Sequence, residues 1–129
     1  MNWNLLALVM AGGALGAGAR YLIGAWLLRQ LGQGLPWGTL AVNLAGSFLA
    51  GFLLIWLEGR GPGALSLRAF LIVGVLGGLT TYSALMIECL IYARGARPGM
   101  LALYLGITLA GGFALVWAGA RLAELVRPA

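Results

Sequence analysis

Short groups of polar residues interrupt an otherwise apolar chain, and their side chains are the best candidates to bind a solute. Thr39, Asn43 and Ser47 recur every four residues, so they line one face of a helix. Tyr104 and Thr108 repeat that spacing later in the chain. Amide and hydroxyl groups must find hydrogen-bond partners in an apolar setting. The spacing therefore indicates either a watery track for a small polar solute or hydrogen-bonded contacts between helices.

A second polar group, GVLGGLTTYSALMIE at residues 74–88, lies within an apolar run. Gly77, Gly78, Thr80 and Thr81 all weaken a helix, glycine through backbone entropy and threonine through β-branching. Non-helical backbone persists in a membrane only where protein or a polar cavity satisfies it. A helix that opens here presents carbonyl groups to a cation, and N–H groups and hydroxyls to an anion. The alternative is a kink used for packing.

Two charged residues lie near these groups. Glu88 follows Thr81 by seven residues and so lies on nearly the same helical face. It is either a functional intramembrane carboxylate or a headgroup-level residue beside Arg94. Arg20 ends an apolar run, so it either snorkels to the interface or lends positive potential to an anion vestibule.

The residue types for catalysis are missing. The chain has no histidine, its three acidic residues are all glutamates far apart in sequence, and Cys89 has no histidine to activate it. Metal-ligand spacings are also lacking. An enzyme is therefore not expected, and passage of a small solute is the favoured class.

Composition places these residues in membrane helices. Of 129 residues 62% are apolar and only 9% charged, whereas soluble domains carry roughly 25% charged residues. A hydrocarbon core of about 30 Å takes roughly 20 residues of helix. We predict one all-α, multi-pass domain over residues 1–129 in the inner (plasma) membrane, with a broken third helix. Its four spans are residues 5–28, 39–57, 67–92 and 100–120.

The net charge of +5 comes from arginines scattered near span ends. With almost no soluble surface to form a basic patch, no nucleic-acid partner is expected. Four arginines fall on each side of the predicted topology, which leaves the positive-inside rule no bias. A chain that inserts both ways suits an antiparallel, dual-topology homodimer, whose eight helices could enclose a polar pathway. The alternative is an orientation set by an assembly factor or partner.

Three segments resemble the signature segments of the Fluc/CrcB fluoride channel family: GGALGAGARY (12–21), PWGTLAVNLAGSFLAG (36–51) and GVLGGLTTYS (74–83). The resemblance covers essentially the whole chain. It implies a dual-topology antiparallel homodimer with two pores, embedded in membrane lipid, that exports fluoride passively, excludes chloride and gives fluoride resistance.

The resemblance also implies roles for individual residues. Asn43 would be the pore-lining amide that donates to the ion, with Thr39 near it. Backbone carbonyls of Gly77 and Thr80, from both chains, would hold a structural sodium ion. The other positions implied for the fluoride pathway are Arg20, Tyr82, Ser83, Tyr104 and Thr108.

One departure from the family pattern concerns aromatic rings. The family shows two phenylalanines three residues apart, where this chain has Tyr82 and Leu85. Tyr82 keeps a ring edge with partial positive charge and adds a hydroxyl donor, whereas Leu85 offers neither. Transport rate and selectivity can therefore differ from the family norm.

Two other functions compete with a fluoride channel. A small four-helix multidrug exporter of dual topology needs a membrane-embedded acid in its first span, but here Glu88 is in the third. A non-transporting membrane subunit would use the polar residues to hold helices together. That function predicts a single orientation and a partner.

Overall fold

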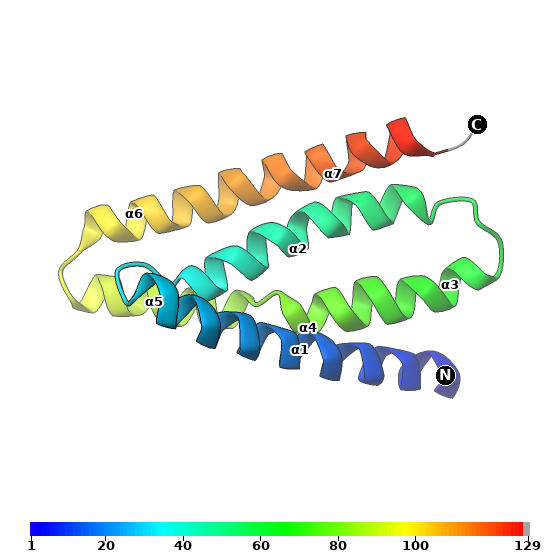
Figure 1. Ribbon diagram of the computed structural model, residues 1–129, viewed down its shortest axis with the longest axis horizontal. Coiled ribbons are helices and arrows are strands. Elements are labelled where there is room, and N and C mark those ends of the chain that lie inside the picture. The colour runs from blue at the N-terminus through cyan, green and yellow to red at the C-terminus, as the bar shows by residue number, and fades with distance from the viewer. Residues whose placement is uncertain (128–129) are drawn as a thin grey trace.

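The structure, a computed structural model, describes residues 1–127, and all regular elements in that range are helical. Figure 1 shows long helical segments that lie roughly along one axis, with successive segments running in opposite directions. In chain order the elements are α1 (Trp3–Leu31), α2 (Trp37–Trp56), α3 (Gly63–Leu67), the π-helical η1 (Arg68–Leu76), α4 (Gly77–Leu79), α5 (Tyr82–Arg94), α6 (Pro98–Gly106), the π-helical η2 (Ile107–Gly111) and α7 (Gly112–Val126).

These elements join into four segments long and apolar enough to cross a membrane: Trp3–Leu31, Trp37–Trp56, Gly63–Arg94 and Pro98–Val126. The prediction of four long apolar helices is confirmed. At most ends the helices continue past the predicted spans, because composition marks the lipid-facing part whereas a helix continues to its cap. At the start of α1, for example, the Asn2 side chain accepts hydrogen bonds from the backbone N–H groups of Asn4 and Leu5.

The third segment, Gly63–Arg94, is not a regular α-helix. It is bent, and after the short helix α3 it continues as the π-helical η1, a form that often occurs at functional sites. Between α4 and α5, Thr80 and Thr81 have extended backbone, with ψ of 153° and 122°. The thin link between the two green ribbons in Figure 1 marks these residues.

Glycines set how closely the segments pack. A Cβ atom on Gly16 of α1 would lie 2.8 Å from the backbone nitrogen of Leu79, and one on Gly74 would lie 2.9 Å from the carbonyl oxygen of Val9. The same close backbone contact joins Gly51 of α2 and Gly119 of α7 to the facing helix. Small residues let membrane helices approach in this way. The bundle is therefore organised as α1 on the third segment and α2 on α7.

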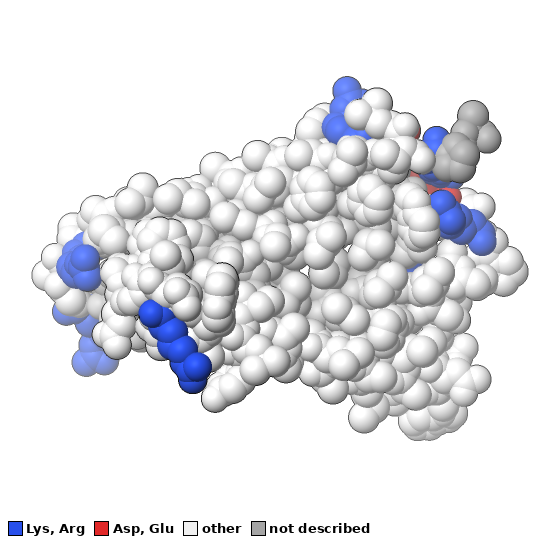
Figure 2. Space-filling model, viewed as in Figure 1, with Lys and Arg blue, Asp and Glu red and all other residues white. Residues whose placement is uncertain are grey.

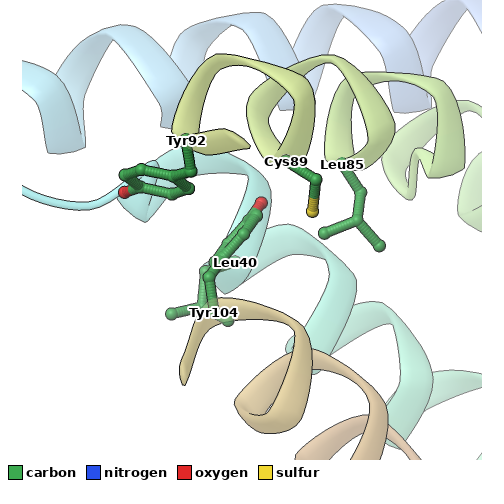
Figure 3. Close-up of a cluster of buried hydrophobic side chains, with 5 residues drawn as sticks. All are labelled: Leu40, Leu85, Cys89, Tyr92 and Tyr104. Carbon is green, nitrogen blue, oxygen red and sulfur yellow. The ribbon is translucent and has the colours of Figure 1, made fainter. Parts of the chain in front are cut away.

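Larger side chains fill the space near the first and third loops. Figure 3 shows this cluster, formed by Leu40 of α2, Leu85, Cys89 and Tyr92 of α5, and Tyr104 of α6. Tyr104 is fully buried, and its ring meets that of Tyr92 edge to face, 6.1 Å between centroids. The cluster fixes α5 and α6 against the start of α2.

The two ends of the bundle differ from its middle. The N-terminus, the second loop and the end of α7 lie at one end, and the first and third loops at the other (Figure 1). On the face in Figure 2 the arginines lie toward these ends, with a broad uncharged band between them. This distribution is that of a protein whose middle lies in lipid.

Candidate functional site

The extended link in the third segment is bound to the side chain of Asn43. Asn43 Nδ2 donates to the carbonyl oxygen of Thr81 at 3.0 Å, and the N–H of Thr81 donates to Asn43 Oδ1 at 2.7 Å. The amide thus pairs with this backbone as a neighbouring β-strand would. One of the two Nδ2 protons remains for another acceptor.

The same link alters the bonding of two carbonyl groups. In a continuous helix, Gly77 O would accept from the N–H of Thr81 and Thr80 O from the N–H of Ala84. Here the N–H of Thr81 bonds Asn43, and that of Ala84 bonds Oγ1 of Thr81, which caps α5. The carbonyls of Gly77 and Thr80 thereby lose their usual helical donors.

The Glu88 carboxylate is hydrogen-bonded to two hydroxyl groups rather than paired with an arginine. Oγ1 of Thr39 donates to Glu88 Oε1 at 2.6 Å, and the hydroxyl of Tyr104 donates to Oε2. The carboxylate is part-buried, and Arg94 is exposed. The Glu88 carboxylate therefore bonds within the bundle and not to Arg94.

Other hydroxyls in the polar stripes bond their own helix. Oγ of Ser47 donates to the carbonyl of Asn43 at 2.7 Å, and Thr108 Oγ1 donates to that of Tyr104 at 2.8 Å. Thr80 does the same with Leu76. Such back-bonding satisfies a hydroxyl in a membrane helix. These hydroxyls must rotate before they can donate to a solute.

Three hollows lie around these groups. The first, of about 240 Å³, is lined by Arg20, Thr39, Thr81 and Glu88 among others. The second, of about 420 Å³, is lined by Asn43, Thr81 and the polar residues Ser47, Thr80, Tyr82 and Thr108. A third, of about 560 Å³, reaches the loop end and shares Glu88 with the first. Thr81 borders the first and second hollows, so the Asn43–Thr81 pair lies between them.

Tyr82 and Leu85, which stand where the family has phenylalanines, have different surroundings. Tyr82 is 73% exposed at the start of α5, beside the second hollow, and Ser83 is exposed next to it. Leu85 is 3% exposed and packs in the buried cluster, although it also borders that hollow. Of these two positions, only Tyr82 has a ring, and that ring is exposed on the protomer.

Comparison with known proteins adds the decisive observation. A family model described as "CrcB-like protein, Camphor Resistance (CrcB)" matches residues 7–120. The chain belongs to the CrcB family. A relative from Xanthomonas euvesicatoria pv. vesicatoria, named fluoride-specific ion channel FluC, is 59% identical over 122 residues, which is 95% of this chain and 92% of the relative.

More distant relatives of the CrcB chain carry the same name. That from Thermus thermophilus is 48% identical over 116 residues, 89% of this chain and 90% of its own length. That from Agrobacterium fabrum is 44% identical over 118 residues, 91% of this chain and 94% of its own. The resemblance seen in the sequence is confirmed. The CrcB family comprises channel proteins rather than enzymes, and this member is a multi-pass protein of the inner membrane.

Sequence reasoning missed the partners of the predicted residues. Arg20, placed by resemblance in a vestibule, donates from Nε to the carbonyl of Gly78 at 3.0 Å. Glu88 had no assigned role, although Thr39 and Tyr104 were both predicted for the pathway. A usable signal existed, since a carboxylate within an apolar run requires donors. The identity of those donors depends on how the helices cross.

Proposed function

We propose that this protein is a fluoride-selective ion channel that gives passive fluoride export and fluoride resistance. It works as an antiparallel, dual-topology homodimer with two pores and a central structural sodium ion. The names of its relatives support the choice of ion. The observation that carries the mechanism is the Asn43–Thr81 pair, which lies between two hollows partly lined by polar side chains, where the backbone leaves the helix.

Fluoride requires several hydrogen-bond donors in succession. The ion is small and tightly hydrated, so it gives up water only where good donors replace it. The second Nδ2 proton of Asn43 is one such donor, and the hydroxyls of Tyr82 and Ser83 are others nearby. Thr39, Tyr104 and Thr108 extend the path when their hydroxyls turn from their present acceptors, and Arg20 lines the first hollow.

The sodium site follows from the freed carbonyls. Gly77 O and Thr80 O lack their usual helical donors, and unwound backbone carbonyls coordinate sodium in other membrane proteins. Two oxygens from one chain are few for the ion. A second copy related by a two-fold axis would supply the same two oxygens again.

The surface of the single protomer supports a partner of this kind. Tyr82 is exposed at the second hollow, together with the exposed hydroxyl of Ser83. A polar wall of this sort is costly against lipid. A second copy on this face would enclose the path, and the equal division of arginines permits the opposite orientation that it needs.

The test is fluoride efflux from liposomes containing the purified protein, read with a fluoride electrode beside chloride-loaded vesicles. We expect fluoride loss without chloride loss. Asn43→Ala should abolish the flux, because it removes both the donor and the bonds that hold Thr81. Asn4→Ala, an amide change at the exposed start of α1, is the matched control and should conduct normally.

Size-exclusion chromatography of each variant shows whether the dimer persists. Normal fluoride flux through dimeric Asn43→Ala would remove Asn43 from the pathway. No flux through the well-folded wild-type dimer would contradict the channel itself.

A further inference from the structure

Arg20 binds the backbone at the point where the third segment stops being helical. Its Nε donates to the carbonyl oxygen of Gly78 at 3.0 Å, from part-buried surroundings and across 58 positions of sequence. The contact is possible because α1 and α4 touch at backbone level. A Cβ atom on Gly78 would lie 3.0 Å from the nitrogen of Ala17. Arg20 lies one helical turn after Gly16, which makes a similar contact.

The carbonyl of Gly78 needs this donor. In a continuous helix it would accept from the N–H of Tyr82, four residues on, but Tyr82 begins the next helix. A carbonyl without a partner is costly in lipid. Asn43 satisfies Thr81 from α2, so the link of Thr80 and Thr81 is held from two different helices.

We infer that Arg20 is a positioning residue: its Nε–H caps Gly78 and holds the interruption in the third segment in place. The hydrogen bond, rather than the positive charge, is the feature required. Its consequence for transport rests on the proposed function, because the carbonyls of Gly77 and Thr80 and the donors Asn43 and Tyr82 are all positioned by this link.

Three variants separate the bond from the charge. Arg20→Gln places an amide N–H the same number of bonds from Cα as Nε and removes the charge. Arg20→Met has similar length without donor or charge. Arg20→Lys keeps the charge but moves the donor one bond further out, and it lacks the planar guanidinium geometry. Arg29→Met is the control, since Arg29 is exposed in the last turn of the same helix.

The first measurement is hydrogen–deuterium exchange of the purified dimer, followed in peptides that span residues 76–86. We expect these peptides to exchange at least about tenfold faster in Arg20→Met than in wild type, because the variant loses one charge-assisted hydrogen bond. Arg20→Gln and Arg29→Met should stay close to wild type. The second measurement is fluoride efflux of the same proteins at low and high salt, where Arg20→Met should lose more flux than Arg20→Gln.

Wild-type exchange in Arg20→Met, or equal acceleration in Arg20→Met and Arg20→Gln, would overturn the inference. If Arg20→Met does not fold, the exchange rates of Arg20→Gln and Arg20→Lys are compared instead. Slower exchange in Arg20→Gln than in Arg20→Lys supports the inference, whereas equal or faster exchange overturns it. Absence of fluoride flux in wild type would reject the proposed function alone, because the exchange comparison needs no transport.

Discussion

At the level of single residues, Glu88 shows how an acid is accommodated inside the helical bundle. An ionised carboxylate only accepts hydrogen bonds, and here each oxygen receives one hydroxyl, from Thr39 and from Tyr104. Both hydroxyls come from residues that the sequence predicts on the fluoride pathway. The carboxylate thus engages both hydroxyl protons, so under the proposed function they must turn away from Glu88 before they can donate to an ion, and the three side chains act as a unit.

We expect the two hydroxyls to be energetically coupled through Glu88. Thr39→Val and Tyr104→Phe should each lower the free energy of unfolding by about 1–3 kcal/mol, because each leaves a part-buried carboxylate oxygen without its donor. The double variant should differ from the sum by about 0.5–3 kcal/mol. Denaturant unfolding of all four proteins measures this. Tyr92→Phe is the control, since the Tyr92 hydroxyl makes a long bond of 3.4 Å to Gly34; strict additivity would show that Glu88 does not couple the pair.

The hydroxyl of Tyr82 is a feature that two phenylalanines would not provide. Because the side chain is 73% exposed in the protomer, Tyr82→Phe should change the free energy of unfolding by less than about 0.5 kcal/mol. If the hydroxyl donates to the ion, Tyr82→Phe should lower fluoride efflux about tenfold, because it removes one hydrogen bond to a charged group. Unchanged efflux would assign the role to the ring edge alone.

Leu85→Phe, which restores the second ring, behaves differently. Leu85 is 3% exposed within the buried cluster, so a larger side chain should lower the free energy of unfolding by about 1–3 kcal/mol. Thermal unfolding of the purified variant measures this change. An equally stable variant would mean that the ring turns into the second hollow instead.

At the level of elements, the interruption between α4 and α5 depends on neighbouring helices. α1 supplies Arg20, and α2 supplies Asn43. Arg20 reaches the third segment because glycines bring the backbone of that segment and that of α1 together, whereas on the side of α2 the side chain of Thr80 packs against Gly46. The two extended residues therefore belong to a contact among three helices, and the geometry of that contact sets their conformation.

Glycine contacts in α1 should be sensitive to a single methyl group. A Cβ at Gly16 would lie 2.8 Å from the nitrogen of Leu79, whereas one at Gly18 would meet no atom within 4 Å. Gly16→Ala should lower the free energy of unfolding by about 1–3 kcal/mol through overpacking. Gly18→Ala should leave it unchanged or raise it by up to about 1 kcal/mol through helix propensity. Denaturant unfolding compares the two, and equal effects would contradict the close packing of α1 on the third segment.

At the level of the whole molecule, the ends of the bundle carry the charge and the middle holds the extended link and the hollows beside it. Arg127 holds one end by donating from Nη2 to the carbonyl of Glu58 at 2.6 Å, which ties the last helix to the end of α2. Charge is shared between the two ends (Figure 2). Neither end is marked as the cytoplasmic one, as a dual-topology dimer requires.

The proposed sodium ion predicts a stability effect on the dimer. A ligand that binds only the folded assembly at about 100 times its Kd adds about 2.7 kcal/mol. The dimer should therefore unfold at higher denaturant concentration in sodium chloride than in the chloride salt of a large organic cation. A control at matched ionic strength with potassium chloride separates specific binding from screening. The same midpoint in all three salts would remove the ion from the mechanism.

The sequence by itself determined the parts of this protein that depend on local composition. Four apolar runs predict four membrane helices, because transfer into lipid sums over neighbouring residues. The glycines and threonines of residues 77–81 predict a weak point in the third helix, because helix propensity is also a local property. The signature segments identified the family, since they are read directly along the chain.

Only the tertiary structure decided which groups meet. Arg20 bonds Gly78 across 58 positions, Thr39 bonds Glu88 across 49, and Asn43 bonds Thr81 across 38. A periodic pattern assigns a residue to a helix face, but its partner depends on which faces touch and how closely. For α1 that choice is made by glycine contacts between backbones, which position Arg20 against the third segment, whereas α2 meets the extended link where the side chain of Thr80 packs on Gly46.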